Sequence, residues 1–288
     1  MSSLGRRIGS FLGFSVLSLA LVGGTSVIWG ALVIGNIRTT PSIPWSLPLL
    51  FVMLWLVWQY LSGRGWPATT SRSRKLLLRA NPVSREALAC SIVAGLFAII
   101  ALAGFWIVAF RLFPMQANLL LPAQFTSSRI LTATIIIGAS ILAPISEESG
   151  IRGYLQTSLE RNFKPATAVA MSSTVFAVAH VAQGIALPKL VFYFLVGVTF
   201  GTLAYLNDSI LPVIPVHIAG DLIFFLFVWP HDRARSLVWR TGADLWFWIH
   251  IVQMIVFTAL AVLVFRRLKQ TRQSTGAFDP CSVQPGAL

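Results

Sequence analysis

The sequence predicts an all-α protein, a polytopic membrane helical bundle with about eight transmembrane helices. Three observations predict this class. Hydrophobic residues make up 56% of the chain and charged residues only 11%, whereas about a quarter of a typical soluble domain is charged. The apolar residues gather in runs of about twenty, the length that an α-helix needs to cross a bilayer. Basic and turn-forming residues separate these runs.

The apolar runs follow one another along the chain. Their expected boundaries are 9–35, 43–62, 87–110, 128–147, 165–183, 187–206, 209–229 and 245–265. Pro41, Pro44 and Pro48 predict an irregular start of the second run, because proline has no backbone N–H to donate. The basic segment 63–85 is expected to be a loop. The polar segment 270–288 is expected to be a disordered tail, because it has little apolar surface to bury.

The 22 Lys and Arg residues give the chain a net charge of +13. They lie between the apolar runs rather than along one soluble face, so no nucleic-acid partner is predicted. Their distribution indicates topology instead. With the N-terminus in the cytoplasm, the cytoplasmic segments hold most of the basic residues, as the positive-inside rule requires. We therefore expect a multi-pass protein of the cell membrane with both termini cytoplasmic.

Several other features exclude further classes of protein. Cys90 and Cys281 offer neither a disulfide framework nor the spacing of metal ligands. The apolar run from Ile8 is too long for the hydrophobic region of a cleaved signal peptide. No internal repeat is visible, so an inverted-repeat transporter gains no support. No catalytic role is predicted for His231, in a loop, or for His250, in an aromatic cluster typical of a membrane interface.

Glu147 and Glu148 stand side by side at the end of the fourth apolar run. A charged side chain at the centre of a bilayer costs roughly 3 kcal/mol, so two adjacent carboxylates need a compensating role. On a helix, Glu148 lies one turn before Arg152 and can form an ion pair with it. Glu147 points about 100° away, lacks that partner and can face another helix. The alternative is a helix end with ordinary interfacial charges.

His180 lies in the fifth apolar run, one helical turn after Phe176. A lone histidine in an apolar helix is often only a hydrogen-bonded core residue. Here a short polar turn at 161–164 joins the two runs, and Glu147 and His180 are almost equally far from it along the chain. Antiparallel helices of equal rise would place both side chains at nearly the same depth. A carboxylate and an imidazole at one level form a candidate pair for activating water.

His217 and Asp221 lie one turn apart in the seventh run and share a helix face. Asp221 could serve catalysis or merely orient His217. Pro212 and Pro215 interrupt the start of this helix, which is tolerated where backbone lines a polar cavity. Ionisable groups inside a membrane pair with one another or line a functional cavity. We therefore expect one site that is shared by the ionisable residues of the three runs: Glu147, Glu148, His180, His217 and Asp221.

At these residues the sequence resembles the CPBP intramembrane protease family, which includes the type II CAAX prenyl endopeptidases. The family pattern is Glu-Glu-x-x-x-Arg, then Phe-x-x-x-His, then His-x-x-x-Asn or Asp, on successive membrane helices. The matching residues are Glu147, Glu148, Arg152, Phe176, His180, His217 and Asp221. We expect residues 125–230 to form the catalytic core. Residues 1–124 are expected to form transmembrane helices without a recognised motif, and residues 231–288 the last helix and the tail.

The resemblance implies a multi-pass endopeptidase whose site opens toward the cytoplasm. In its metal-free account, the residues that match Glu147 and His180 activate a water that attacks the peptide carbonyl. Those that match His217 and Asp221 stabilise the oxyanion. Three further residues would support the site: Glu148, Arg152 and Phe176. In a competing account the residue set Glu147, His180, His217 and Asp221 binds zinc.

Two departures from the family pattern affect these roles. Asn is the commoner residue at the position of Asp221, and an ionised Asp cannot donate a hydrogen bond to an oxyanion. Asp221 would have to be protonated, orient His217 or bind a metal. The filler Ser149-Gly150-Ile151 is smaller than the family pattern leads us to expect, which predicts more space near the site.

The partners expected are the lipid bilayer and a peptide or lipidated-protein substrate, and no cofactor is predicted other than a possible zinc ion. A zinc site needs three or four N or O ligands at about 2 Å, and the sequence alone does not decide between the zinc-bound and metal-free mechanisms. Two other functions use the same residues differently. One is a proton- or cation-coupled transporter, and the other is a non-catalytic membrane scaffold or immunity factor.

Overall fold

The computed structural model describes residues 3–40, 42–117 and 128–274, and the regular elements in these ranges are helices. Six helical stretches in the described residues are long and apolar enough to cross a membrane. They are α1 (Ser3–Thr39), α4 (Arg85–Leu112), α5 (Arg129–Glu147) with its continuation to Glu160, α8 (Leu187–Asn207), α9 (Val213–Ile223) with its continuation to Ala234, and α11 (Leu245–Ser274). Two apolar helices are shorter, α2 (Ser46–Leu61) and α7 (Pro165–Ala179). These helices occupy the predicted places, so the multi-pass membrane helical bundle is confirmed.

Short elements connect the long helices. Those of α-helical form are α3 (Ser71–Leu78), α6 (Thr157–Glu160) and α10 (Val238–Thr241). Turns of 3₁₀ helix cover Ala68–Thr70, Val181–Gln183 and Trp229–Ala234. Two π-helical segments, Glu148–Gln156 and Phe224–Val228, continue α5 and α9 without a break.

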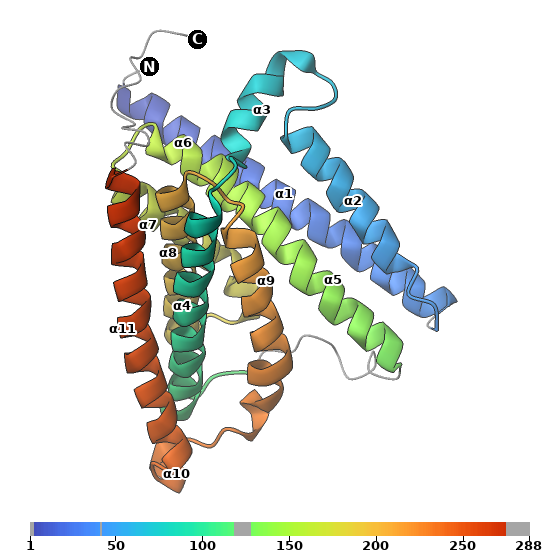
Figure 1. Cartoon of the computed structure of the whole chain (residues 1–288). Helices are drawn as coiled ribbons and strands as arrows, with labels where there is room; N and C mark the ends of the chain where they lie inside the picture. The colour runs from blue at the N-terminus through green and yellow to red at the C-terminus, as the bar shows by residue number, and fades with distance from the viewer. Residues whose placement is uncertain (1–2, 41, 118–127, 275–288) are drawn as a thin grey trace.

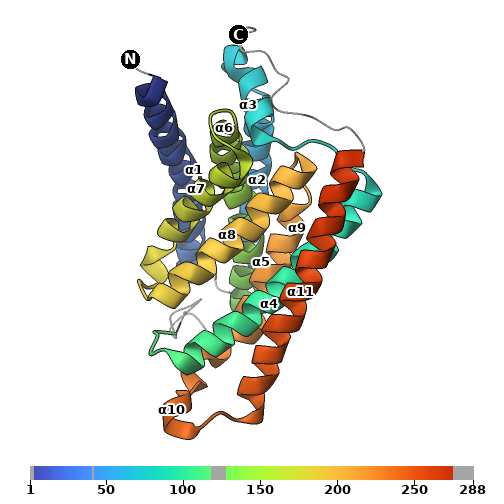
Figure 2. The same cartoon turned by 90° about the vertical axis from the view of Figure 1, so that its left-hand side faces the viewer.

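The long helices form two groups that α5 joins (Figure 1). In one group α4 packs along α11, α8 and α9, and α7 packs along α8. In the other, α1, α2 and α5 contact one another, and α5 also contacts α9. The start of α1, α3, α6 and the end of α11 lie on one side of the bundle, and α10 lies on the opposite side (Figure 2). The segments predicted to share one side of the membrane therefore lie together at one end of the bundle.

Small residues let the helices approach closely. A Cβ added at Gly104 of α4 would lie 2.9 Å from the backbone oxygen of His250 in α11. One added at Gly95 would overlap the side chain of Val216 in α9. Close packing of this kind stabilises helices in a membrane, because lipid and apolar side chains are equally apolar and the hydrophobic effect contributes little. The two glycines therefore hold α11 and α9 against α4.

Several helix boundaries differ from the prediction, each for a local reason. The fourth run continues to Glu160 instead of ending at residue 147, since the next proline after the two glutamates is Pro165. The fifth ends at Ala179 rather than 183, because the chain turns toward Gly184, which has a positive φ of 124°. The seventh begins at Val213, after Pro212, rather than at 209. The last helix extends to Ser274, so the start of the expected disordered tail 270–288 is helical, and 275–288 lie outside the described residues.

The segment 63–85 is not a simple loop, because it contains α3. Leu77 and Leu78 of α3 are buried, which gives this basic stretch an apolar face to pack. At the end of α3, the buried guanidinium of Arg79 binds Glu160 at 2.9 Å and Asp208 at 2.8 Å. These ion pairs attach α3 to the ends of α6 and α8.

Candidate active site

Glu148 and Arg152 form the buried base of the candidate site. Arg152 Nη1 donates to Glu148 Oε1 at 3.0 Å, and both side chains are 0% exposed. The expected ion pair one turn apart is therefore present. The Arg152 guanidinium also lies over the ring of Phe176 at 4.3 Å and that of Phe200 at 5.4 Å. Such cation–π contacts compensate part of the cost of burying the charge.

The backbone of this pair is a π-helical segment of nine residues, Glu148–Gln156. π-Helical turns are rare and frequently occur at functional sites. Glu147, the last residue of α5, therefore stands where the helix widens.

His217 of α9 contacts Glu148 directly. Its Nδ1 lies 2.8 Å from Glu148 Oε1, the same oxygen that Arg152 binds. Because a carboxylate only accepts, Nδ1–H must be the donor. Sequence spacing gave no signal for this contact, since the two residues are 69 positions apart on different helices. Glu148 thus fixes the orientation of the imidazole and leaves Nε2 as the ring nitrogen that faces the rest of the site.

The other ring nitrogen of His217 faces two carboxylates. Nε2 lies 3.8 Å from Glu147 Oε2 and 3.6 Å from Asp221 Oδ1. Glu147 Oε2 and Asp221 Oδ2 are buried and form no hydrogen bond within the described part of the chain. Unpaired buried oxygens are costly, so they call for a functional explanation. The three side chains make a polar centre at the depth where α5 meets α9.

His180 lies at the end of α7 rather than deep inside it. Its backbone N–H bonds to the carbonyl of Ala177 at 3.1 Å, which leaves the Phe176 carbonyl to accept from His180 Nδ1 at 2.8 Å. The ring stacks on Tyr193 of α8, with centroids 4.1 Å apart. Its Nε2 is therefore the acceptor nitrogen of the neutral ring.

The expected pairing of Glu147 with His180 takes a different form. The described residues show no hydrogen bond or ion-pair contact between His180 and Glu147. Glu147 instead forms its ion-pair contact with His217. The helices do not end at equal depths, because α5 continues through the π-helical segment while α7 stops at Ala179.

The small residues that follow the two glutamates, Ser149-Gly150-Ile151, do not enlarge the site. Ser18 Oγ of α1 donates to the carbonyl of Gly150 at 2.7 Å. A Cβ added at Gly150 would lie 3.2 Å from the backbone oxygen of Ser18. Ser149 and Ile151 are buried as well. The expectation of extra space is wrong, because α1 fills it.

The four predicted zinc ligands do not form a metal site as they are arranged. In the described ranges no group of three or more His, Cys, Asp or Glu side chains is placed to hold a metal ion. His217 Nε2 has carboxylate oxygens at 3.6 and 3.8 Å, somewhat wider than the roughly 3.3 Å that tetrahedral zinc geometry implies between ligand atoms. These spacings do not fit a tetrahedral zinc ion at the described side chains.

Residues 128–223 match a family model described as type II CAAX prenyl endopeptidase Rce1-like. Over this segment the chain is similar to the Rce1-like family. The match includes every motif residue from Glu147 to Asp221 and so confirms the resemblance seen in the motifs. Neither a curated protein nor a solved structure matches the chain.

The Rce1-like segment begins at Ser128, which caps α5, and ends at Ile223, the end of α9. It therefore carries all the side chains of the polar centre. Helices outside it support those side chains, with α1 packed on Gly150 and α4 packed on α9. The Rce1-like family is one of intramembrane proteases, and the apolar helices of this chain place it among multi-pass membrane proteins.

Proposed function

We propose that the chain is an intramembrane endopeptidase that hydrolyses a peptide bond in a membrane-associated peptide or lipidated-protein tail. The observation that carries this proposal is the polar centre of Glu147, Asp221 and His217 Nε2 within the Rce1-like segment. Hydrolysis inside a membrane needs a base for water and a donor for the developing oxyanion. The family description supports a tail ending in a prenylated CAAX motif as the first substrate class to test.

Glu147 and His180 are the proposed base. Glu147 Oε2 has no hydrogen-bond partner in the described residues, so it is available to accept a proton from water. The bond from His180 Nδ1 to the Phe176 carbonyl leaves Nε2 as an acceptor that can hold the same water. The attacking hydroxide adds to the peptide carbonyl carbon, and the proton held by Glu147 passes to the leaving amine.

His217 is the proposed oxyanion donor. Three carboxylates lie around its ring: Glu148 at Nδ1, and Glu147 and Asp221 near Nε2. In the proposed mechanism His217 is an imidazolium whose Nε2–H donates to the oxyanion. Asp221 then stabilises the imidazolium instead of donating, which accounts for an Asp at this position. Glu148 is a positioning residue, because it holds His217 through Nδ1.

The function is tested by comparing membrane peptides from cells that carry either wild-type protein or Glu147→Gln. The variant keeps the size of the side chain and removes its basic carboxylate. Glu86→Gln, the same change at an exposed residue of α4, is the matched control. We expect mass spectrometry to find truncated tails with wild type and Glu86→Gln, and intact tails with Glu147→Gln. Identical peptide sets in all three strains would refute the proposed function.

The metal-free form of the mechanism makes a separate prediction. Purified active protein is expected to hold less than stoichiometric zinc and to keep its activity after treatment with a chelator. Metal analysis by mass spectrometry checks this. Stoichiometric zinc that disappears in His217→Ala or Asp221→Ala would replace the metal-free mechanism with a zinc-dependent one.

A further inference from the structure

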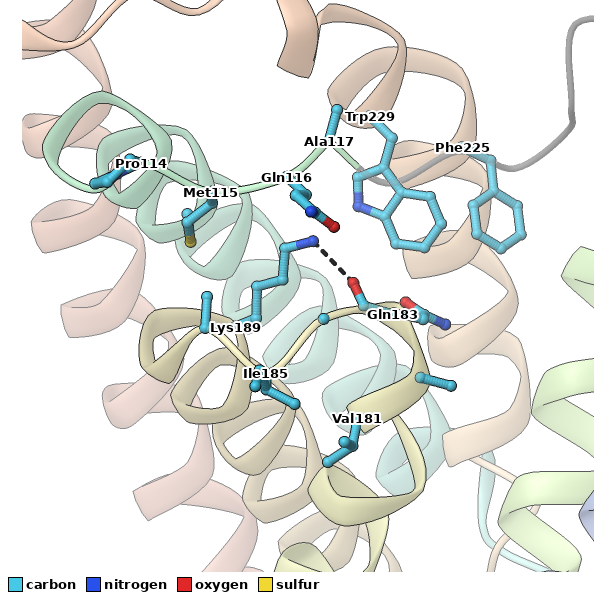
Figure 3. Close-up of a pocket in the computed structure, with 13 residues that line it drawn as sticks. Pro114, Met115, Gln116, Ala117, Val181, Gln183, Ile185, Lys189, Phe225 and Trp229 are labelled. Atoms are coloured by element: carbon cyan, nitrogen blue, oxygen red, sulfur yellow. Dashed lines mark hydrogen bonds between the residues drawn. The ribbon is translucent and has the colours of Figure 1, made fainter.

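A pocket of about 570 Å³ lies on the α10 side of the bundle, between the end of α4 and the segment 232–240, which includes the start of α10. No side chain of the polar centre lines this pocket. Pro114, Met115, Gln116 and Ala117 line both the pocket and a neighbouring cavity of about 860 Å³, which Figure 3 shows. The proposed peptidase mechanism assigns no role to the smaller pocket.

Three arginines line this pocket: Arg233, Arg235 and Arg240. Asp232 is the one carboxylate among the described residues that line it. Asp232 already accepts from Arg235 Nε at 3.0 Å and from Trp106 Nε1 at 3.2 Å. Arg233 and Arg240 are exposed, and their side chains form no hydrogen bond or ion pair within the described ranges. The lining residues therefore carry a surplus of two positive charges.

Arg235 is held in place for binding an anion. Its side chain is only 11% exposed, and that of its partner Asp232 is 0% exposed. Arg235 Nη2 donates to the Val228 carbonyl at 2.8 Å, so Nε and Nη2 are both occupied. Nη1 has no hydrogen-bond partner in the part of the chain that the structure describes, and it is not fully buried. This nitrogen can therefore donate to an oxygen of a ligand without any loss of protein contacts.

The rest of the pocket is largely apolar and lies near a membrane interface. Phe110, Phe113 and Leu237 are among its lining residues, and Phe113 directly follows α4, the end of a candidate membrane span. Trp239 of α10 and Trp246 near the start of α11 are exposed. Exposed tryptophans are enriched at the level of the lipid headgroups. The pocket thus combines arginines with apolar surface at the depth where headgroups and acyl chains meet.

Membrane topology does not account for these arginines. The predicted orientation places the α10 side away from the cytoplasm (Figure 2), where the positive-inside rule predicts few basic residues. No further carboxylate is at hand to compensate their charge. The sequence from Leu112 to Ser128, which follows α4, contains no Asp or Glu. Asp244 is already paired with Arg111 at 3.1 Å. A ligand that brings its own negative charge would supply the compensation.

We propose that this pocket binds an anionic phospholipid, with its phosphate on the three arginines and its acyl chains along the apolar residues. Guanidinium groups match phosphate oxygens in geometry and charge. Phosphatidylcholine carries a positive choline group that the same arginines repel, so the pocket should prefer phosphatidylglycerol. The inference goes beyond the proposed peptidase function and does not depend on it, and its test needs no cleavage assay.

The test measures lipid binding to the purified full-length protein in a neutral detergent by native mass spectrometry. We expect wild type to bind dioctanoyl phosphatidylglycerol at least about tenfold more tightly than phosphatidylcholine with the same chains, because charge-assisted hydrogen bonds to phosphate are the stronger kind. Arg233→Gln combined with Arg240→Gln should abolish this preference. The matched control combines Arg72→Gln with Lys75→Gln, which removes two exposed charges from α3 on the other side of the bundle, and should keep it.

Each other outcome overturns the proposal. Equal binding of the two lipids by wild type, or a preference that survives the loss of Arg233 and Arg240, would exclude a phospholipid site in this pocket. An equal loss of preference in the α3 control would show that overall positive charge binds the lipid. Glycerophosphoglycerol, the same headgroup without acyl chains, separates a lipid from a soluble phosphate ester. If it binds wild type as tightly as phosphatidylglycerol does, the site takes a soluble ester and the lipid is ruled out.

Discussion

Among single residues, Glu148 has the largest role that spacing along the chain does not reveal. Its position predicts an ion pair with Arg152, and that pair is present, but the same oxygen also holds His217. Both donors bind Oε1 of this buried carboxylate. The other oxygen, Oε2, has no hydrogen bond in the described residues. Glu148, which directly follows α5, therefore joins the buried Arg152 to His217 of α9.

The dual role of Glu148 can be separated by a double-mutant cycle. Glu148→Leu alone leaves the Arg152 charge buried without its partner, which is expected to cost about 3–5 kcal/mol of unfolding free energy. Adding Arg152→Met removes that charge and should recover most of the lost stability. Activity should stay at least about 100-fold below wild type, because His217 loses the acceptor that positions it. Thermal unfolding in detergent and kcat measure the two effects, and a stable double variant with wild-type kcat would contradict the positioning role.

Asp221 gives a second prediction at this scale. Glu147 and Glu148 remain as carboxylates beside the His217 ring, so Asp221→Asn, which keeps a polar side chain near Nε2, should keep kcat within about tenfold of wild type. Asp221→Leu, which has the same branched shape and no polar atom, should lose at least about 100-fold. Steady-state cleavage rates check both values. Loss of activity in Asp221→Asn equal to that in Asp221→Leu would show that the negative charge itself is required.

The sequence identified the residues of the polar centre because charged groups are rare in its apolar runs. It could not pair them correctly across helices. Helical spacing reports contacts within one helix, such as Glu148 with Arg152, whereas the contact of Glu148 with His217 depends on how α5 and α9 pack.

At the scale of elements, the separation of α4 and α9 controls the position of His217. Gly95 of α4 contacts Val216, the neighbour of His217. Gly95→Ile would push α9 away and is expected to cost about 1–3 kcal/mol through overpacking, with at least a tenfold loss of activity. Gly23→Ile on α1, where an added Cβ meets nothing within 4 Å, is the matched control. Equal activity in the two variants would contradict this account of α9.

The positions of the long helices could be predicted because the length of each apolar run determines them. The residues at which these helices end could not be predicted in the same way. The end of α7 at Ala179 depends on a 3₁₀ turn that begins at Val181. The helical content of 71–78 was missed because only a short apolar run, which includes Leu77 and Leu78, interrupts a basic stretch. Local packing decides such boundaries, and hydropathy averaged over a span does not resolve them.

For the whole molecule, the charge pattern predicts that α3 and both chain ends face the cytoplasm. This is tested with single cysteines after Cys90 and Cys281 are replaced by serine. We expect an impermeant maleimide to label exposed Trp239→Cys near α10 in intact cells, and to label exposed Thr69→Cys only after permeabilisation. The opposite pattern would contradict the predicted orientation.

The whole molecule combines an Rce1-like segment of α5 to α9 with supporting helices from both ends of the chain. The central claim is that this assembly hydrolyses a peptide bond with water activated by Glu147. The most direct test is a single-turnover reaction of purified protein in H₂¹⁸O, using a tail identified by the membrane comparison. The account predicts one ¹⁸O atom in the new carboxylate of the product with wild type, and no product with Glu147→Gln. Label in the protein instead of the product, or cleavage by Glu147→Gln at the wild-type rate, would contradict it.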